Sequence, residues 1–210
     1  MKKIIVFLLL LVSLNIFASN KKVLVIVAPE NFYTDEFFYP EIELGRAGIG
    51  FDIASTKTGF INGVYFDSTK VINNDSTTGY VSVKNAIYTE LTLDKVVIKN
   101  YAAVIIIGGS GTITHLWQNE ELKKIIQDFK KANKYICGIC AGSVVLAKSG
   151  VLKGITATTY PDVNLSKELE NNGAIYIDEK VIIDKKHKII TSNGPMGAQD
   201  FGKAIVDCLK

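Results

Sequence analysis

Residues 135–143 (YICGICAGS) pass from an apolar strand pattern through small residues into a helical pattern that begins at Val144. A cysteine at such a corner leaves the sheet and lies at a helix N-terminus. There, unpaired N–H groups and the helix dipole favour a thiolate over a thiol. Cys137 lies in the middle of the strand pattern, as a structural cysteine would. Cys140, at the corner, is therefore predicted to be a nucleophile.

Residues 1–18 have the pattern of a secretory signal peptide. A basic start at residues 1–3 is followed by an apolar run over residues 4–17 and by small residues from Ala18. The run is shorter than the roughly 20 apolar residues of a membrane anchor. We expect cleavage after Ala18, a single domain over residues 19–210, and a periplasmic or secreted protein that is not held in a membrane.

The remainder of the chain is electrically balanced. Of the 24 basic and 21 acidic residues, Lys2 and Lys3 belong to the predicted signal peptide, which leaves 22 against 21. This balance offers no electrostatic basis for binding nucleic acid or an anionic membrane. The three cysteines are an odd number, which argues against a disulfide scaffold. Cys137 and Cys140 would lie about 10 Å apart on an extended strand, so a bridge requires the turn to begin early.

Alternating strand and helix patterns predict an α/β sandwich with a mainly parallel sheet. Buried strands are expected at residues 22–28, 51–55, 102–107 and 134–139, and helices at 35–48, 119–133, 164–172 and 197–209. Pro40 is expected in the first turn of its helix or at a kink. The polar segment 56–95 suggests a short hairpin. Further strands are expected at residues 156–159, 175–177, 181–184 and 188–191, the last three as a hairpin.

Two of these strands end in residues that carry chemistry. Gly108 and Gly109 close the strand at 102–107, and Cys140 closes the strand at 134–139. Ligands of parallel α/β sheets gather outside the carboxyl ends of the strands. We therefore expect the glycine loop and Cys140 to lie together at one edge of the sheet.

The acidic helix start at Asp35-Glu36, the Gly-Gly strand end and the cysteine elbow together resemble the ThiJ/PfpI (DJ-one) superfamily of deglycases, chaperones and PfpI-type peptidases. The matching segments cover nearly the whole mature chain, with residues 56–95 the weakest part. They are residues 36–48 (EFFYPEIELGRAG), 103–111 (AVIIIGGSG), 135–142 (YICGICAG), 152–158 (LKGITAT) and 191–195 (TSNGP). The resemblance implies a flavodoxin-like three-layer sandwich with a cysteine nucleophile elbow, and a homodimer.

The resemblance also implies roles for individual residues. Cys140 matches the nucleophile, and Glu36 matches the acid whose protonated carboxyl hydrogen-bonds the sulfur. The N–H groups of Gly109 and Ala141 match the pair that holds an oxyanion. Physical chemistry agrees, because a desolvated carboxyl has a raised pKa and can donate to S⁻. Glycine at 109 lets the backbone approach closely.

One position departs from the family pattern. Many members carry histidine before proline in the segment that reads Thr158-Thr159-Tyr160-Pro161 here, and PfpI-type peptidases carry histidine where Ala141 stands. Tyr160, with a reference pKa near 10, cannot act as a base near neutral pH but can donate a hydrogen bond. We expect Tyr160 to orient the substrate, and we do not expect peptidase activity.

The remaining candidates are weaker. His115 follows the glycine loop, so His115 and Gly108 are candidate pocket residues, whereas His187 belongs to a basic turn. Two histidines in such different contexts predict no zinc or other metal site. The Gly108–Gly111 segment lacks the residues of a phosphate-binding loop, so no nucleotide cofactor is expected.

The leading hypothesis is a cysteine-dependent enzyme that acts on small reactive carbonyls, as a glyoxalase or deglycase does, without a cofactor. The first alternative is a redox-sensing protein of oxidative stress, in which Cys140 oxidises without turnover. The second is a non-catalytic binding domain. A glutaminase also uses a cysteine elbow, but residues 191–195 offer no histidine–acid pair for it.

Overall fold

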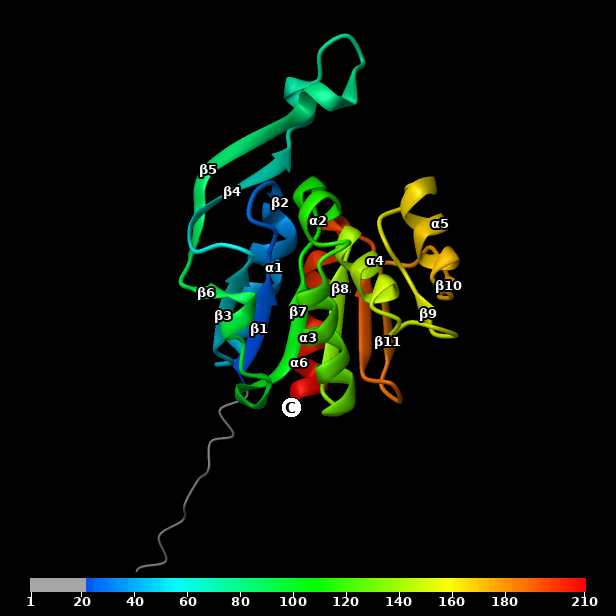
Figure 1. The fold of residues 1–210 in the computed structure, drawn as a ribbon. Coiled ribbons are helices and arrows are strands. Elements are labelled where there is room, and N and C mark those ends of the chain that lie inside the picture. The colour runs from blue at the N-terminus through cyan, green and yellow to red at the C-terminus, as the bar shows by residue number, and fades with distance from the viewer. Residues whose placement is uncertain (1–21) are drawn as a thin grey trace, which may run out of the picture.

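The computed structural model describes residues 22–210, so the predicted signal peptide lies outside the described residues. Their central element is a seven-stranded sheet in which every pair except β11–β12 is parallel (Figure 1). Its strands, in order across the sheet, are β11 (Val181–Asp184), β12 (Ile189–Ser192), β8 (Tyr135–Ile139), β7 (Tyr101–Ile106), β1 (Lys22–Ile26), β3 (Phe51–Ser55) and β6 (Leu91–Thr92).

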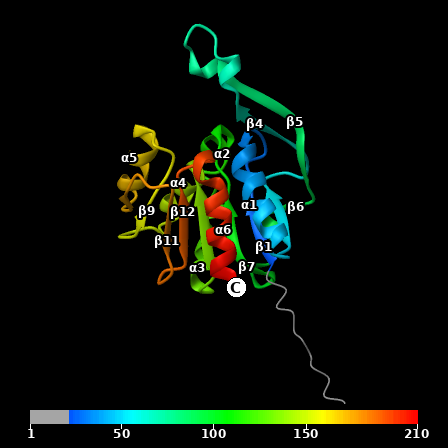
Figure 2. The same ribbon diagram turned by 180° about the vertical axis from the view of Figure 1, so that it is seen from behind.

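Helices cover both faces of this sheet, as Figures 1 and 2 show from opposite sides. One face carries α1 (Thr34–Arg46) and α6 (Ala198–Leu209), and the other carries α3 (Glu120–Lys131) and α4 (Ala141–Lys148). Outside α4 lie α5 (Val163–Asn171) and a small parallel pair of β9 (Thr156–Ala157) and β10 (Ile175–Tyr176). The predicted three-layer, flavodoxin-like sandwich is confirmed.

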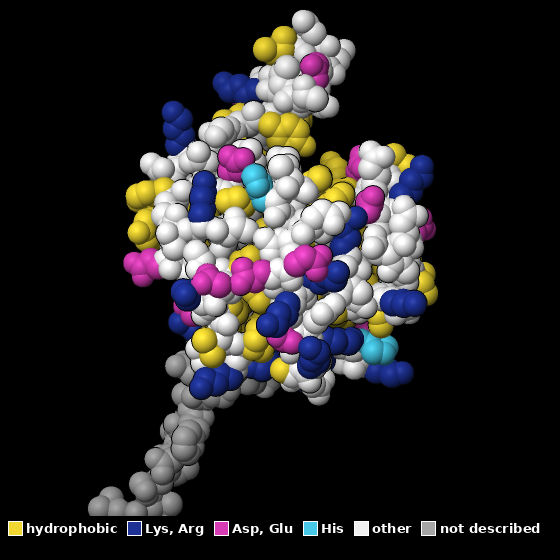
Figure 3. Space-filling view, viewed as in Figure 1, with side chains coloured by type: hydrophobic (Ala, Val, Ile, Leu, Met, Phe, Trp, Pro, Cys, Tyr) yellow, Lys and Arg dark blue, Asp and Glu magenta, His cyan; other side chains and the backbone are white. Residues whose placement is uncertain are grey.

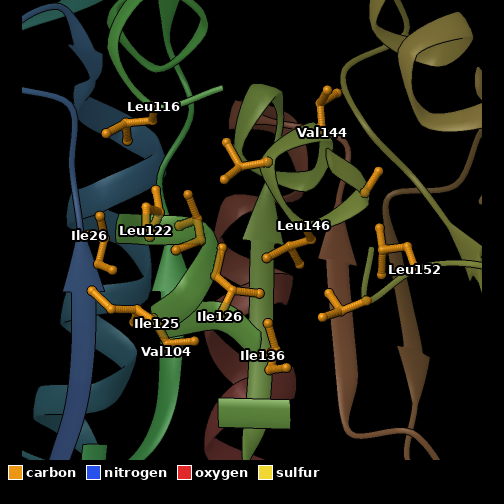
Figure 4. Close-up of a cluster of buried hydrophobic side chains, with 14 of the residues drawn as sticks. Ile26, Val104, Leu116, Leu122, Ile125, Ile126, Ile136, Val144, Leu146 and Leu152 are labelled. Atoms are coloured by element: carbon orange, nitrogen blue, oxygen red, sulfur yellow. The ribbon is translucent and has the colours of Figure 1, made fainter. Parts of the chain in front are cut away.

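Each central strand sends alternate side chains into two separate cores. On β7, Val104 and Ile106 join the core below α3 and α4, whereas Ala103 and Ile105 join the core below α1 and α6. Figure 4 shows the first core, in which strand residues such as Ile136 meet the apolar stripe of α3. That stripe has helical spacing, and it consists of Leu122, Ile125, Ile126 and Phe129.

Beside this body, a long hairpin forms a structure that we call the arm, residues 59–89. Its strands are β4 (Gly59–Phe66) and β5 (Tyr80–Thr89), which pair antiparallel, and β4 also pairs with β2 (Phe32–Tyr33). Figure 1 shows the arm projecting beyond the body near α2 (Ser110–His115). The hairpin is thus longer than predicted, because its strands keep pairing after they leave the body.

Some other local predictions are wrong. β10 pairs with β9 in parallel, instead of forming a hairpin with β11. Pro40 lies in the second turn of α1, and the helix continues through it to Arg46. α6 approaches α1 closely there, since a Cβ at Gly202 would lie 2.8 Å from the Pro40 Cα. No helix among residues 22–210 has the length and apolar character needed to span a bilayer.

Candidate functional site

The corner between β8 and α4 has the geometry of a nucleophile elbow. Cys140 is the N-cap of α4, with φ 55° and ψ −129°, a conformation that a non-glycine residue adopts only under strain. Its N–H donates to the Ser192 carbonyl at 2.9 Å, and its carbonyl accepts from the Thr159 hydroxyl at 2.7 Å. These bonds hold the strained corner and aim the side chain beyond the end of the sheet.

The Glu36 carboxyl lies beside Cys140. Glu36 is in the first turn of α1 and is fully buried. Its Oε2 accepts a hydrogen bond from the Gly108 N–H at 3.0 Å. Its Oε1 pairs with no nitrogen or oxygen of the described residues, and the carboxyl interacts with the Cys140 side chain. A Cβ at Gly108 would lie 2.5 Å from Oε2 and 2.7 Å from the Cys140 Cβ, so only glycine lets the two groups meet.

Both acidic groups of this pair bind protons strongly. Burial raises the pKa of the Glu36 carboxyl to about 8, which leaves it mainly neutral at pH 7. Burial, with a further contribution from Glu36, also raises the pKa of the Cys140 thiol, while the N–H groups of Ala141 and Gly109 lower it. The helix N-terminus thus acts in the predicted direction, but burial outweighs it. The two groups titrate as a coupled pair.

The N–H groups of Gly109 and Ala141 both point at the Cys140 sulfur. Ala141 is the first residue of α4, and Gly109 is the N-cap of α2 with φ 103°. A Cβ at Gly109 would lie 2.5 Å from the Asn31 carbonyl oxygen and could not be accommodated. Two donors converging on one atom are the geometry that holds a developing oxyanion.

A cavity of about 810 Å³ opens over Cys140. Glu36, Gly109, Ala141 and Tyr160 all contribute to its lining. Tyr160 is 45% exposed. Its ring lies close to Cys140, since a Cβ at Gly194 would be 3.1 Å from Tyr160 Cδ2 and 3.6 Å from the Cys140 Cβ. The site is therefore an open pocket whose floor is the Cys140–Glu36 pair.

A DJ-1/PfpI family model matches residues 21–208, nearly all of the chain. The chain belongs to the DJ-1/PfpI family. It is 33% identical over 192 residues to an uncharacterised protein of Methanocaldococcus jannaschii. The aligned stretch covers 91% of this chain and 84% of that protein. It is also 29% identical over 163 residues to a deglycase of Pyrococcus horikoshii, covering 78% of this chain and 85% of the deglycase.

Other relatives match over a shorter stretch or through the fold. A glutathione-independent glyoxalase of Schizosaccharomyces pombe is 32% identical over 124 residues, or 59% of this chain and 62% of the glyoxalase. The crystal structure of Drosophila melanogaster DJ-1beta superposes with a TM-score of 0.70 at 28% identity, covering 89% of each chain. A ThiJ/PfpI domain protein of Brachyspira murdochii gives a TM-score of 0.74 at 24% identity, over 90% of this chain and 95% of the other.

Within this DJ-1/PfpI fold, the structure separates the predicted site residues. Cys140, Glu36, Gly108, Gly109, Ala141 and Tyr160 come together. His115 does not line the cavity, because it ends α2 on the outer side and its Nε2 pairs with Glu30 at 3.0 Å. His187 pairs with Asp184 at 2.6 Å in the β11–β12 turn. The three cysteines are free, and no trio of His, Cys, Asp or Glu within residues 22–210 could hold a metal ion.

Sequence reasoning did not find four aromatic residues of the site, namely Tyr33, Phe66, Tyr80 and Trp117. Trp117 lines the cavity, and its Nε1 donates to the Ala141 carbonyl at 3.2 Å, next to the elbow. Tyr33 and Tyr80 also line the cavity. Tyr33 precedes the acidic start of α1, a position that marks it out in the sequence. Nothing local marks Tyr80, because its approach to Cys140 depends on the path of the arm.

Proposed function

We propose that this protein is a cysteine-dependent enzyme that acts on small reactive carbonyls by glyoxalase- or deglycase-like chemistry. The observation that carries the proposal is the meeting of Cys140, a buried proton-holding Glu36 and two convergent N–H groups at the floor of one cavity. The deglycase of Pyrococcus horikoshii and the glyoxalase of Schizosaccharomyces pombe support this choice within the family.

The first step is addition of sulfur to a 2-oxoaldehyde, R–CO–CHO. Loss of one proton from the pair leaves a single proton, which resides on Glu36 when Cys140 is a thiolate. The sulfur forms a bond to the aldehyde carbon, and the carbonyl π electrons move to oxygen. The N–H groups of Gly109 and Ala141 stabilise this oxyanion, which takes the Glu36 proton to give a hemithioacetal.

The second step moves a proton between neighbouring carbons. The Glu36 carboxylate removes the hydrogen of the former aldehyde carbon, and the resulting enediol is protonated at the adjacent carbon. This gives the Cys140 thioester of a 2-hydroxy acid, which water cleaves to R–CH(OH)–COOH and free thiol. The aldehyde carbon is oxidised and the ketone carbon is reduced, so the reaction needs water and no external oxidant.

Tyr160 stands where many family members carry histidine. Tyr160 is half-exposed and lines the cavity, and its hydroxyl is suited to donating a hydrogen bond to the ketone oxygen of the substrate. On this account Tyr160 orients the substrate, and Glu36 carries all proton transfer. Tyr160→Phe should raise KM and lower kcat/KM by about tenfold, the effect of one hydrogen bond to substrate.

The test of the proposed function is formation of lactate from methylglyoxal by the mature chain. Cys140→Ser should reduce kcat by at least about 100-fold, because a hydroxyl in the same place is a much weaker nucleophile. Cys208→Ser, which changes a cysteine of α6 outside the cavity, is the matched control and should behave as wild type. Equal turnover by the Cys140→Ser variant would refute the proposal.

One observation favours a second function, a peroxide sensor. The unpaired Oε1 of Glu36 and its neutral carboxyl at pH 7 provide a donor for an oxygen atom bound to the Cys140 sulfur. Two peroxide molecules would each transfer one oxygen and leave a sulfinate held by Glu36. Intact mass after graded peroxide tests this idea, since a sensor gains two oxygens at Cys140 before Cys208 reacts.

A further inference from the structure

The arm supplies an aromatic wall to the cavity over Cys140. Phe66 on β4 and Tyr80 on β5 both line the cavity, and their rings pack edge to face with centroids 5.4 Å apart. The body adds further apolar side chains to the lining, those of Ile113 of α2, Leu165 of α5 and Met196. Figure 3 shows hydrophobic side chains on the arm beside the hollow that separates it from the α5 side. An apolar group entering the cavity thus meets apolar side chains of both the arm and the body.

The position of this wall is tied to the catalytic loop. The Tyr33 hydroxyl accepts a hydrogen bond from the Phe66 N–H at 3.1 Å, and the Tyr33 N–H donates to the Gly108 carbonyl at 3.2 Å. Burial raises the pKa of Tyr33 to about 12, so the phenol stays neutral at working pH. One residue therefore links the start of the aromatic wall to the loop beside Cys140.

Tyr80 is the arm residue that is best placed to contact the substrate. Its ring lines the cavity, and its phenol is close enough to the pair that burial, Tyr160, Cys140 and Glu36 all raise its pKa. It is 54% exposed in this structure, so most of its apolar surface remains available for a ligand. A bound aromatic or branched group would cover this ring and that of Phe66.

The charges around the cavity exclude an anionic substrate. Among the residues that line it, the carboxyl groups are those of Glu36 and Asp162, and none of the lining residues is Lys, Arg or His. Asp162 is already used, because its Oδ1 accepts from the N–H groups of Asn164 and Leu165 at the start of α5. A carboxylate or phosphate on the substrate would lose its water without gaining a cationic partner.

We propose that the preferred substrate is an uncharged 2-oxoaldehyde with an aryl or branched alkyl group, and that Tyr80 of the arm selects it. This inference rests on the proposed function and adds the class of side group. The cavity of about 810 Å³ belongs to the size range of sites for far larger molecules than methylglyoxal. Atoms balance as before, since phenylglyoxal and water give mandelic acid through the Cys140 thioester.

The first test compares kcat/KM for phenylglyoxal, methylglyoxal and the anion glyoxylate. We expect phenylglyoxal to exceed methylglyoxal by about tenfold, the effect of burying one ring against aromatic side chains, and glyoxylate to be the poorest. Tyr80→Ala should abolish the preference, and Tyr80→Phe should restore it. Tyr88→Ala is the matched control, because Tyr88 is a 52% exposed residue of the same strand that pairs with Phe60 and does not line the cavity.

The second test measures binding without chemistry. Trp117 is the single tryptophan of the chain and lines the cavity, so its fluorescence reports occupancy. In the Cys140→Ser variant, acetophenone should quench this fluorescence with a Kd about tenfold lower than that of benzoate, and Tyr80→Ala should weaken acetophenone binding.

The two tests separate the proposals. Acetophenone binding that depends on Tyr80, without turnover of any 2-oxoaldehyde, would refute the proposed function and support the apolar pocket. Turnover of methylglyoxal at least equal to that of phenylglyoxal, in wild type and Tyr80→Ala alike, would overturn the inference and leave the proposed function in place. Equal binding of benzoate and acetophenone would also overturn it.

Discussion

The α/β body and the arm of residues 59–89 are held in place in different ways. In the body, a residue such as Ile105 is fully buried between the sheet and a helical layer, and its neighbours fix the backbone. In the arm, β4 and β5 pair mainly with each other, and the buried anchors Ile61 and Ile87 lie at the base. Beyond that base the apolar side chains are half-buried or exposed, as for Ile72 at 62% exposed.

This difference assigns the two regions different tasks. The body can hold Cys140 at a strained φ of 55° because buried strands and hydrogen bonds leave it no alternative. The arm contributes side chains to the cavity without contributing to the strained corner. We therefore expect changes in the body to alter stability or rate, and changes in the outer arm to alter substrate preference.

The largest expected effect is on the pH dependence of stability. The Glu36 pKa is 4.5 in the unfolded chain and about 8 in the folded protein, so between these values the folded state holds a proton that the unfolded state lacks. Stability that is fully present below pH 4.5 is therefore lost as the pH rises toward 8, by on the order of 4 kcal/mol. Glu36→Gln removes this loss, so its denaturation midpoint should exceed that of wild type at pH 8 and approach it at pH 5.

An arm carboxylate provides the matched control. Asp67 is partly exposed, and hydrogen bonds from Thr69 lower its pKa. Its charge is the same in the folded and unfolded states above pH 5, so Asp67→Asn should leave the slope of stability between pH 5 and pH 8 unchanged. If the Glu36→Gln variant keeps the wild-type slope of stability against pH, this would contradict the claim that the Glu36 carboxyl is buried and neutral in the folded protein.

The next largest effect is expected on the free energy of unfolding, when a packed side chain is shortened in the body and an exposed one in the arm. Ile105→Ala should lower the free energy of unfolding by about 3 kcal/mol, because it leaves a cavity under α1 and α6. Ile72→Ala, at the outer arm, should change it by less than about 0.5 kcal/mol. Urea denaturation of both variants measures the difference, and comparable losses would mean that the outer arm is part of the cooperative core.

A smaller effect is expected from a single methyl group at the elbow. Gly108→Ala should reduce kcat/KM by about 100-fold, or about 2.7 kcal/mol, because the new Cβ forces Glu36 and Cys140 apart. Gly45→Ala, on the open side of α1 where a Cβ meets nothing within 4 Å, should leave kcat/KM unchanged. Steady-state kinetics with methylglyoxal checks both variants, and full activity of Gly108→Ala would contradict the tight Glu36–Cys140 contact.

The sequence predicts the body better than the arm for a physical reason. A strand buried on both faces is a continuous apolar run, and the prediction for residues 102–107 matches β7 (Tyr101–Ile106) to within one residue at each end. In the arm most side chains face solvent, so apolar alternation extends over only a few residues and understates the length of β4 and β5. α2 was missed because its sequence, SGTITH, contains few strong helix formers.

The same reasoning explains which site residues could be found. Gly109 and Cys140 follow directly from strand ends, which the fold brings together, whereas the oxyanion role of the Gly109 and Ala141 N–H groups was implied only by the family resemblance. The raised pKa of Glu36 was expected from burial, whereas the net upward shift at Cys140 was not, since it depends on how fully the corner is enclosed. Tyr80 could not be found, because only the three-dimensional path of the arm brings it to the cavity.

The central claim is that Cys140 and Glu36 titrate as one buried unit. Its most direct test is the pH dependence of Cys140 alkylation by iodoacetamide, followed by peptide mass in wild type, Glu36→Gln and the α1 control Glu41→Gln. We expect a wild-type midpoint above that of an ordinary thiol, because burial and Glu36 both raise the pKa of Cys140. Glu36→Gln should move the midpoint downward and speed the reaction at about pH 7.5, because it removes the carboxyl group that helps to raise the Cys140 pKa, while Glu41→Gln should match wild type. A Glu36→Gln profile that superimposes on the wild-type profile would contradict the account.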